Sequence, residues 1–304
     1  MEQSKEPVFY LNGKLVPDSE AKVTVRDRSF LYGDGIYDTF IIWNGWPYKM
    51  DDHLERMINS MRLLLVKSPL TRTEMKKYLI STIEANHMKY GYIRFQISRG
   101  VGLLSDRWDR LESGPNWVII PYDEFKREEL MSQVEKGYSA VTTATRKIPE
   151  GCLPAQAKHC NYLNNVLGAI DRAKSGADIG IMLGTDGCVR EGLMYSVFLA
   201  KDGIIYTPAL GNILPGITRK AIIGLAQKDG LVVIEKDNMD PGFLQSADEI
   251  FISAVSKSCL SVTRMNGKKV GSGRTGPIAK RVRQLLFADM DKEAHNKQRS
   301  NRCA

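Results

Sequence analysis

Three Asn-Gly pairs, each set between two strand-like runs, restrict the fold of this sequence more than any other feature. Asn-Gly accepts the positive φ angles that both central residues of a two-residue hairpin turn require. The pairs therefore predict antiparallel hairpins that join residues 8–11 to 14–16, 37–43 to 47–50 and 259–265 to 268–270. Such hairpins exclude a fold made of the βαβ repeats of a doubly wound sheet.

Helices and further strands occupy the rest of the chain. Apolar residues at helical spacing, and prolines at helix starts, predict helices at 53–66, 73–87, 161–175, 217–228 and 277–287. Apolar runs of strand length are predicted as strands at 92–99, 116–121, 138–144, 179–183, 195–200, 203–206, 231–235 and 249–253. This mixture predicts an α+β protein.

The length of 304 residues suits two domains of about 150 residues each. The segment 122–135 is charged and poor in apolar residues, so we expect it to link a small lobe, 1–121, to a larger lobe, 136–291. The last residues, 292–304, are basic and polar and predict a solvated tail beyond the final helix.

The composition argues against membrane, metal and nucleic-acid partners. The longest apolar runs fall far short of the roughly 20 residues of a spanning helix, and no secretory signal is apparent, so we expect no membrane partner. Five cysteines without paired spacing predict free thiols, a cytoplasmic location and no metal site. The net charge of +8 is partly concentrated in the tail, and no motif supports nucleic acid as the main partner.

Two stretches offer a nucleophile and an acid. Lys158 stands just before a predicted helix in an otherwise uncharged stretch. A lysine held away from water has a lowered pKa and becomes a nucleophilic amine, whereas an exposed loop lysine is the alternative interpretation. Glu191 precedes an apolar strand. If it is buried, its carboxylate needs a partner that shares a proton, such as a pyridine nitrogen; otherwise it is a turn residue.

Two more stretches offer phosphate-binding groups. Pro215 and Gly216 lead into a helix whose first N–H groups have no intrahelical partner, and such an end can bind phosphate or can simply be capped. Arg56 lies beside the apolar stripe of helix 53–66. It could reach inward to phosphate as a bidentate donor or extend along the surface.

In order and spacing, these four stretches resemble the class IV, or fold-type IV, pyridoxal phosphate enzymes. That family includes branched-chain and D-amino acid aminotransferases, (R)-selective amine transaminases and aminodeoxychorismate lyases. The resemblance extends from residue 10 to about 287 and includes the stretches 25–35 and 276–277. It implies a small α/β lobe, a larger pseudo-barrel α/β lobe, and a homodimer with its site near the lobe and subunit boundary.

The resemblance also implies residue roles. Lys158 would hold pyridoxal 5'-phosphate in a Schiff base and move a proton between the substrate and the cofactor. Glu191 would bond the pyridine nitrogen and keep it protonated. The other implied cofactor contacts are Tyr162 at the phenolic oxygen and, at the phosphate, Arg56 with the backbone N–H groups of Ile217 and Thr218.

Two positions depart from the family pattern. Ser196 stands where the family usually has asparagine, five residues after the glutamate. Val255 stands where a threonine often bonds the phosphate, and the neighbouring Ser256 is the predicted substitute. Fewer such contacts would predict weaker retention of the cofactor.

The stretch 92–94 resembles the branched-chain strand whose arginine helps to bind the substrate carboxylate, which makes Arg94 a candidate. Alternation along 92–99 would place Arg94 on one face with Gln96 and Ser98. Arg28 is a second candidate for the carboxylate, and Arg107 is a weaker one.

The stretch 35–40, with Tyr37 as a predicted substrate residue, lacks the branched-chain Glu-Gly-Ile-Arg sequence. It is more similar to D-amino acid aminotransferases and the lyase. The Arg-x-His carboxylate trap of the usual D-amino acid enzymes should fall near 104–106, where it is absent.

Three functional readings follow. The first is an aminotransferase that moves an amino group between an amino acid, branched-chain-like or D-, and a 2-oxo acid. The second is a carbon–carbon lyase of the aminodeoxychorismate type. The third is a catalytically weak binding or regulatory protein that retains the fold. A nucleic-acid binder acting through the basic tail is a further alternative.

Overall fold

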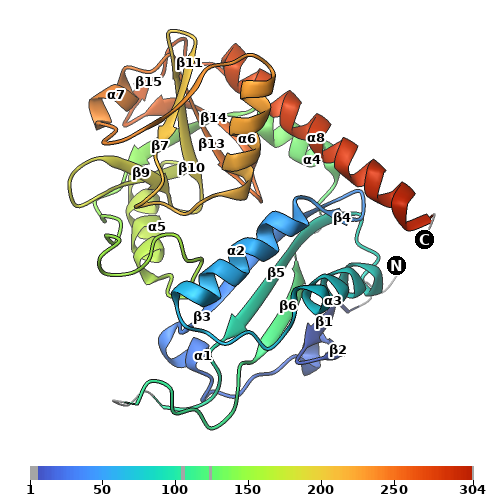
Figure 1. Ribbon diagram of the computed structural model, residues 1–304. Coiled ribbons are helices and arrows are strands. Elements are labelled where there is room, and N and C mark those ends of the chain that lie inside the picture. Colours follow the sequence, from blue (N-terminus) through green and yellow to red (C-terminus); the bar gives the residue numbers. More distant parts are fainter. Residues whose placement is uncertain (1–5, 104–106, 123–124, 303–304) are drawn as a thin grey trace. The chain divides into compact units, whose positions relative to one another are not determined.

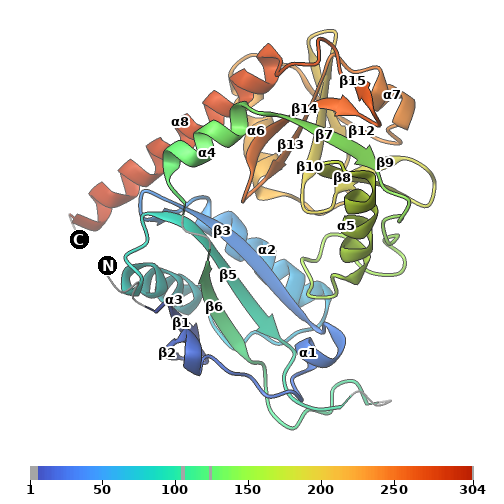
Figure 2. The same ribbon diagram turned by 180° about the vertical axis from the view of Figure 1, so that it is seen from behind.

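The computed structural model describes residues 6–103, 107–122 and 125–302, and the chain divides into two compact units. The N-terminal unit comprises Met1–Phe125, Ala157–Asn161 and Glu293–Ala304, and the C-terminal unit comprises Lys126–Gln156 and Tyr162–Lys292. Each unit contains one sheet with helices packed on it (Figures 1 and 2). The expected linker, 122–135, includes the point where the chain changes unit, but most of it forms helix α4 (Arg127–Glu135).

The sheet of the N-terminal unit has the strand order β2-β1-β6-β5-β3-β4, and every neighbouring pair is antiparallel. The first predicted hairpin is confirmed, and both turns, Asn12-Gly13 and Asn44-Gly45, have positive φ angles. The second hairpin forms at its predicted turn, but its second strand covers only Trp46–Pro47 instead of 47–50, because a helix begins at Met50. The strands are β1 (Val8–Leu11), β2 (Lys14–Pro17), β3 (Gly35–Trp43), β4 (Trp46–Pro47), β5 (Tyr90–Ser98) and β6 (Trp117–Tyr122).

Helices α2 (Met50–Leu63) and α3 (Arg72–Ala85) cover one face of this sheet, and Figure 2 turns the other face to the reader. Leu54 and Met57 of α2 and Phe40 of β3 are fully buried on the covered face. The unit also contains the short helices η1 (Asp18–Glu20) and α1 (Arg28–Tyr32), which the hydrophobic pattern did not predict. Because side chains alternate along β3, Tyr37 and Ile41 point to the opposite face, where both are also buried. This is the open face of the sheet, so called because α2 and α3 do not cover it.

The C-terminal unit contains a mixed nine-stranded sheet among the residues that the structure describes, in the order β12-β11-β10-β13-β14-β7-β8-β9, with β15 beside β14. Three pairs are parallel, namely β11 with β12, β14 with β7, and β7 with β8. The strands are β7 (Gly137–Thr142), β8 (Ile179–Leu183), β9 (Val189–Gly192), β10 (Ser196–Lys201), β11 (Ile204–Pro208), β12 (Val233–Lys236), β13 (Glu249–Ala254), β14 (Ser258–Met265) and β15 (Lys268–Lys269). The third predicted hairpin, β14–β15, is confirmed.

The helices of this unit, besides α4, are α5 (Leu163–Ser175), α6 (Ile217–Lys228), α7 (Pro241–Gln245) and the first part of α8 (Pro277–Arg302). From Glu293 on, α8 belongs to the N-terminal unit. The predicted end of the last helix near residue 287 is wrong, because α8 continues to Arg302. Residues 288–302 contain no Gly or Pro, and nine of these 15 residues are the good helix formers Ala, Met, Lys, Glu, Gln and Arg, so nothing stops the helix. Most of the predicted basic tail is therefore helical.

Two kinds of feature are absent from the described ranges. No helix within them is long and apolar enough to cross a membrane. Those same ranges hold no group of three or more His, Cys, Asp or Glu side chains arranged to bind a metal ion.

Candidate active site

The segment Ala157–Asn161 lies in the N-terminal unit, where it pairs antiparallel with the start of β3. The Tyr37 N–H donates to the Lys158 carbonyl at 3.0 Å, and the Cys160 N–H donates to the Gly35 carbonyl at 2.9 Å. Residues directly opposite in an antiparallel pair point to the same face. Lys158 therefore shares the open face of the sheet with Tyr37.

The amine of Lys158 is held beside the Tyr37 side chain. Its Nζ lies 3.4 Å from the Tyr37 hydroxyl and 4.4 Å from the centre of the ring. The Lys158 N–H donates to the Ser60 hydroxyl of α2 at 3.0 Å, so the backbone is anchored as well. These contacts show an ordered, partly buried lysine and contradict the alternative of an exposed loop lysine.

Arg94 lies on the same face and contacts the same tyrosine. Its guanidinium carbon is 3.7 Å from the centre of the Tyr37 ring, and its Nε donates to Gln96 Oε1 at 2.9 Å. The register of β3 with β5 sets Arg94 opposite Thr39 and Gln96 opposite Tyr37. The structure thus brings together three predicted site residues, Lys158, Tyr37 and Arg94.

The other arginine candidates have different surroundings. Arg28 is buried, with its Nη2 2.9 Å from Asp34 Oδ2 and its Nη1 donating to the Trp108 carbonyl at 2.6 Å. Arg107 pairs with Asp109 on the surface. The stretch 104–106, where the carboxylate trap was expected, lies outside the described residues. Arg94 differs from Arg28 and Arg107. The hydrogen bond that it donates to an oxygen among the described residues uses Nε, so its two terminal nitrogens are the groups that could bind a substrate carboxylate.

Arg56 belongs to a buried cluster on the α2 side of the sheet. Its Nε and Nη2 donate to the two Asp38 oxygens at 2.9 and 2.7 Å, and His53 Nδ1 lies 2.9 Å from Asp38 Oδ1. Although burial acts in the opposite direction, the charges of Arg56 and His53 hold the pKa of Asp38 well below its usual range. Burial lowers the pKa of His53, against the attraction of Asp38. Asp38 is thus the anion that balances Arg56.

In the C-terminal unit, Glu191 of β9 is buried, as the sequence suggested. Its Oε1 lies 2.6 Å from Lys147 Nζ, and its Oε2 accepts the Leu214 N–H at 3.1 Å. Lys147 was not anticipated from the sequence. Because the carboxylate is buried in a strand and held by these two partners, its interpretation as a simple turn residue is wrong.

The start of α6 has the form expected of an anion-binding helix end. Gly216 is its N-cap and gives no side-chain cap, so the N–H groups of Ile217 and Thr218 lack intrahelical partners. Thr218 is buried, and a Cβ added to Gly216 would lie 2.8 Å from Ser196 Oγ. Ser196, at the start of β10, therefore lies directly against this helix end.

The two remaining predicted contacts also lie in the C-terminal unit. Tyr162 is the N-cap of α5, and its hydroxyl donates to the Leu193 carbonyl at 3.0 Å. Ser256 lies in the turn between β13 and β14. Neither observation tests the cofactor roles that the resemblance implied for them.

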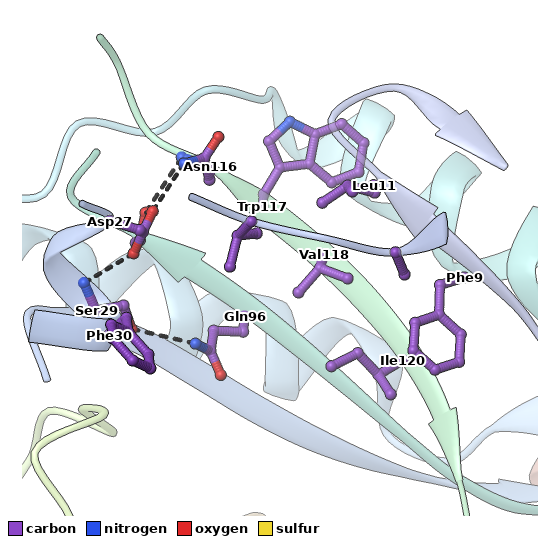
Figure 3. A pocket seen from close by; sticks show the side chains of 13 residues that line it. Phe9, Leu11, Asp27, Ser29, Phe30, Gln96, Asn116, Trp117, Val118 and Ile120 are labelled. Carbon is purple, nitrogen blue, oxygen red and sulfur yellow. Dashed lines mark hydrogen bonds between the residues drawn. The ribbon is translucent and has the colours of Figure 1, made fainter. Parts of the chain in front are cut away.

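A pocket of about 290 Å³ lies in the N-terminal unit (Figure 3). It continues along the open face from Gln96, because Val118 of β6 stands opposite Gln96 and Leu11 of β1 stands opposite Val118. Its polar end is the Asp27 carboxylate, which accepts bonds from the Ser98 hydroxyl and the Asn116 amide, both at 2.7 Å. The remaining wall is mostly apolar and consists of Phe9, Leu11, Ala21, Val23, Ser29, Phe30, Gln96, Trp117, Val118 and Ile120.

Comparison with known proteins identifies the family. The family model described as "Amino-transferase class IV" matches residues 35–265. A putative branched-chain-amino-acid aminotransferase of Methanocaldococcus jannaschii is 32% identical over 280 residues, which cover 91% of this chain and 94% of the relative. The chain belongs to the class IV aminotransferases. A D-alanine aminotransferase of Bacillus licheniformis is 30% identical over 276 residues, or 90% of this chain and 94% of the relative.

Solved structures agree with this family. A branched-chain aminotransferase from the thermophilic archaeon Thermoproteus uzoniensis, solved with norvaline, has a TM-score of 0.86 and 28% identity, covering 95% of this chain and 96% of that one. The Escherichia coli branched-chain amino acid aminotransferase has a TM-score of 0.86 and 28% identity, covering 93% of this chain and 94% of that one. The predicted family and the α+β, two-lobe fold-type IV class are therefore confirmed.

The predicted reaction class is confirmed with the family, because this chain is a class IV aminotransferase and the relatives named above are transaminases. The lyase alternative is not favoured by them. Sequence reasoning missed several residues around the predicted site, namely Asp38, His53, Ser60, Lys147 and Cys160. One signal was available for Asp38, since a lone carboxylate within the apolar run 36–43 indicates a buried ion pair.

Proposed function

We propose that this class IV aminotransferase binds pyridoxal 5'-phosphate through Lys158 and moves an amino group between an amino acid and a 2-oxo acid. The observation that carries the proposal is the shared contact with Tyr37. The Lys158 amine lies 3.4 Å from the Tyr37 hydroxyl, and the Arg94 guanidinium stacks on the same ring. Tyr37 thus contacts both functional groups. The Lys158 amine can bind a carbonyl cofactor covalently, and the Arg94 guanidinium can bind a carboxylate.

The chemistry of the residues in the C-terminal unit fits the same cofactor. The buried Glu191 carboxylate is held through one oxygen by the Leu214 N–H, and its other oxygen, which pairs with Lys147, is the proposed acceptor for a protonated ring nitrogen. The start of α6, with Gly216 as its N-cap, offers the N–H groups of Ile217 and Thr218 to a phosphate. Tyr162, Ser196, Ser256 and Arg56 remain proposed contacts to the cofactor, on the strength of the family resemblance.

Each residue then has a defined task. Pyridoxal phosphate, when bound, supplies an electron sink that stabilises the carbanion formed at the substrate α-carbon. Lys158 Nζ would take the proton from the substrate α-carbon and give it up again after the amino group has moved. Glu191 would accept a hydrogen bond from the protonated ring nitrogen. Arg94 binds the substrate carboxylate and so fixes the direction of the α-C–H bond relative to Lys158.

The substrate is proposed to be a branched-chain-like amino acid or a D-amino acid. The two relatives described above carry those two names, putative branched-chain-amino-acid aminotransferase and D-alanine aminotransferase, at 32% and 30% identity. Tyr37 and Arg94 are the proposed substrate-binding residues. Arg28 is the weaker candidate, because Asp34 and the Trp108 carbonyl already occupy its terminal nitrogens.

A homodimer is part of the proposal, and exposed apolar residues support it. On α5, Leu163, Val166, Leu167 and Ile170 are 45–65% exposed and share one helix face. On α1, Phe30 is 69% exposed. Apolar faces of this kind are typical of protein interfaces. A cytoplasmic location stays a prediction from the cysteine pattern.

The proposal is tested by half-reactions. The purified protein is saturated with pyridoxal phosphate and mixed with L- and D-forms of leucine, valine and alanine, and the cofactor spectrum is followed. We expect conversion to the amino form of the cofactor with at least one donor, and release of the matching 2-oxo acid. Borohydride reduction before the reaction should attach the cofactor to the peptide that contains Lys158.

Two variants sharpen the test. Lys158→Ala should abolish the half-reaction while the protein stays folded, because no positioned base remains. Lys77→Ala, which removes an exposed lysine of α3, is the matched control and should retain activity. Recovery of the label on another lysine, or half-reaction by Lys158→Ala, would disprove the assignment. Pyruvate release from aminodeoxychorismate without amino transfer would favour the lyase.

A further inference from the structure

Arg94 is joined to two other elements of the N-terminal unit by a chain of side-chain hydrogen bonds. Its Nε donates to Gln96 Oε1 at 2.9 Å, and Gln96 Nε2 in turn donates to the Ser29 hydroxyl at 3.1 Å. Figure 3 shows Gln96 of β5 turned toward Ser29 of α1, whose N–H donates to the Asp27 carboxylate at 2.8 Å. The Gln96 amide thus accepts a hydrogen bond from Arg94 through its oxygen and donates one to Ser29 of α1 through its nitrogen.

Cys160 lies beside this chain of contacts. Burial raises the pKa of its thiol, against the opposing influence of the Ser29 hydroxyl and the Arg94 guanidinium. Cys160 comes two residues after Lys158 on the same extended segment, and it faces Gly35, which has no side chain. The arginine is therefore surrounded by Tyr37, Gln96 and Cys160.

We propose that Gln96 is a positioning residue that sets the orientation of Arg94 for the substrate carboxylate. The inference rests on the proposed function, in which Arg94 binds that carboxylate. Stacking on Tyr37 restrains the plane of the guanidinium but leaves it free to turn within that plane. The bond from Nε to Gln96 removes that freedom and leaves both terminal nitrogens for a bidentate pair.

The amide is chemically suited to this task. A glutamate at position 96 would also accept the Nε bond, but its charge would neutralise Arg94 and repel a carboxylate ligand. A neutral amide orients the arginine without competing for its charge. The second bond, to Ser29, fixes which end of the Gln96 amide faces the arginine.

The test is a double-mutant cycle in the full-length holoenzyme. The variants are Gln96→Met, Arg94→Ala and the double variant, and the substrate is the best amino acid found in the half-reaction screen. Met keeps the length of the side chain and removes the amide. We expect Gln96→Met to raise KM by about tenfold, the value of one ordinary hydrogen bond, with kcat nearly unchanged. Arg94→Ala should raise KM by about ten- to a hundredfold.

The decisive measurement is the effect of Gln96→Met in the Arg94→Ala background. If Gln96 acts through Arg94, the second substitution changes KM by less than about twofold, because it has no arginine left to orient. The inference is overturned if Gln96→Met raises KM tenfold in both backgrounds, or if it does not raise KM in the wild-type background. Arg94 keeps its proposed role in either case. An unchanged KM in Arg94→Ala overturns the assignment of Arg94 itself, and the inference falls with it.

A second variant covers the case in which Gln96→Met does not fold. Gln96→Glu retains the acceptor and the size of the side chain. It should raise KM for the amino acid by about tenfold or more and leave the amide of the same amino acid, which has no carboxylate, within about twofold. An equal rise in KM for the amino acid and for its amide would show a general disturbance of the sheet and would overturn the inference.

Discussion

Replacing Asp38 with asparagine should destabilise the N-terminal unit strongly. Asp38 is fully buried and accepts two bonds from Arg56, whose side chain is only 6% exposed. Asparagine has one oxygen and no charge, so the variant leaves a buried cation without its anion. Removing one partner of a buried ion pair costs about 3–5 kcal/mol. At roughly 2–4 °C per kcal/mol, the melting temperature should fall by about 6–20 °C.

The pH dependence gives an independent check. The pKa of Asp38 is depressed in the folded protein, so its contribution is present above the unfolded value of about 3.9 and is lost as the pH falls below it. Asp38 also favours the protonated form of His53, so the difference in stability between wild type and Asp38→Asn should grow as the pH falls from 7 to about 4.5. It should shrink at lower pH, where Asp38 itself becomes protonated. Differential scanning calorimetry at several pH values measures both quantities.

A matched variant separates the unpaired charge from the loss of packing. The double variant Asp38→Leu with Arg56→Met removes both charges, and it should be more stable than Asp38→Asn. A loss below about 1 kcal/mol in Asp38→Asn would refute the argument that this cluster stabilises the fold. A double variant as unstable as Asp38→Asn would refute the buried charge as the cause.

Two further predictions concern separate parts of the molecule. Glu191→Gln should bind the cofactor but slow the spectral half-reaction strongly, because an amide cannot hold the ring nitrogen protonated; full turnover would show that Glu191 does not serve the ring. Thr71→Ala removes the capping box at the start of α3, in which the Thr71 and Glu74 side chains accept each other's N–H bonds. It should cost about 1 kcal/mol in urea denaturation with KM unchanged, and a changed KM would contradict a purely structural role.

The sequence predicted those parts of the fold that local interactions determine. The Asn-Gly turns fix hairpins between neighbouring strands, and Pro215 with Gly216 marks the start of α6 at the predicted residue. The parallel pairs of β7 with β14 and with β8 join strands that are far apart in the sequence. Hydrophobic alternation identifies such strands but contains no information about which strand each one pairs with.

The candidate site could be predicted to a similar extent. Alternation along 92–99 correctly set Arg94 and Gln96 on one face, but only the register shows that Gln96 stands opposite Tyr37. Asp38 and Lys147 were missed because their partners, Arg56 and Glu191, belong to other elements. Side-chain pairs across elements depend on tertiary packing, which a single sequence does not reveal.

Helix α2 connects the two clusters of the N-terminal unit. The Ser60 hydroxyl accepts the Lys158 N–H at 3.0 Å and donates to the Arg56 carbonyl at 2.8 Å. Residues four apart lie one above the other on a helix, so the backbone that carries Lys158 is anchored one turn beyond the arginine that pairs with Asp38. A movement of α2 would displace both groups together. The spacing between the proposed attachment lysine and the proposed phosphate arginine is thus set by one turn of helix rather than by the 101 intervening residues of sequence.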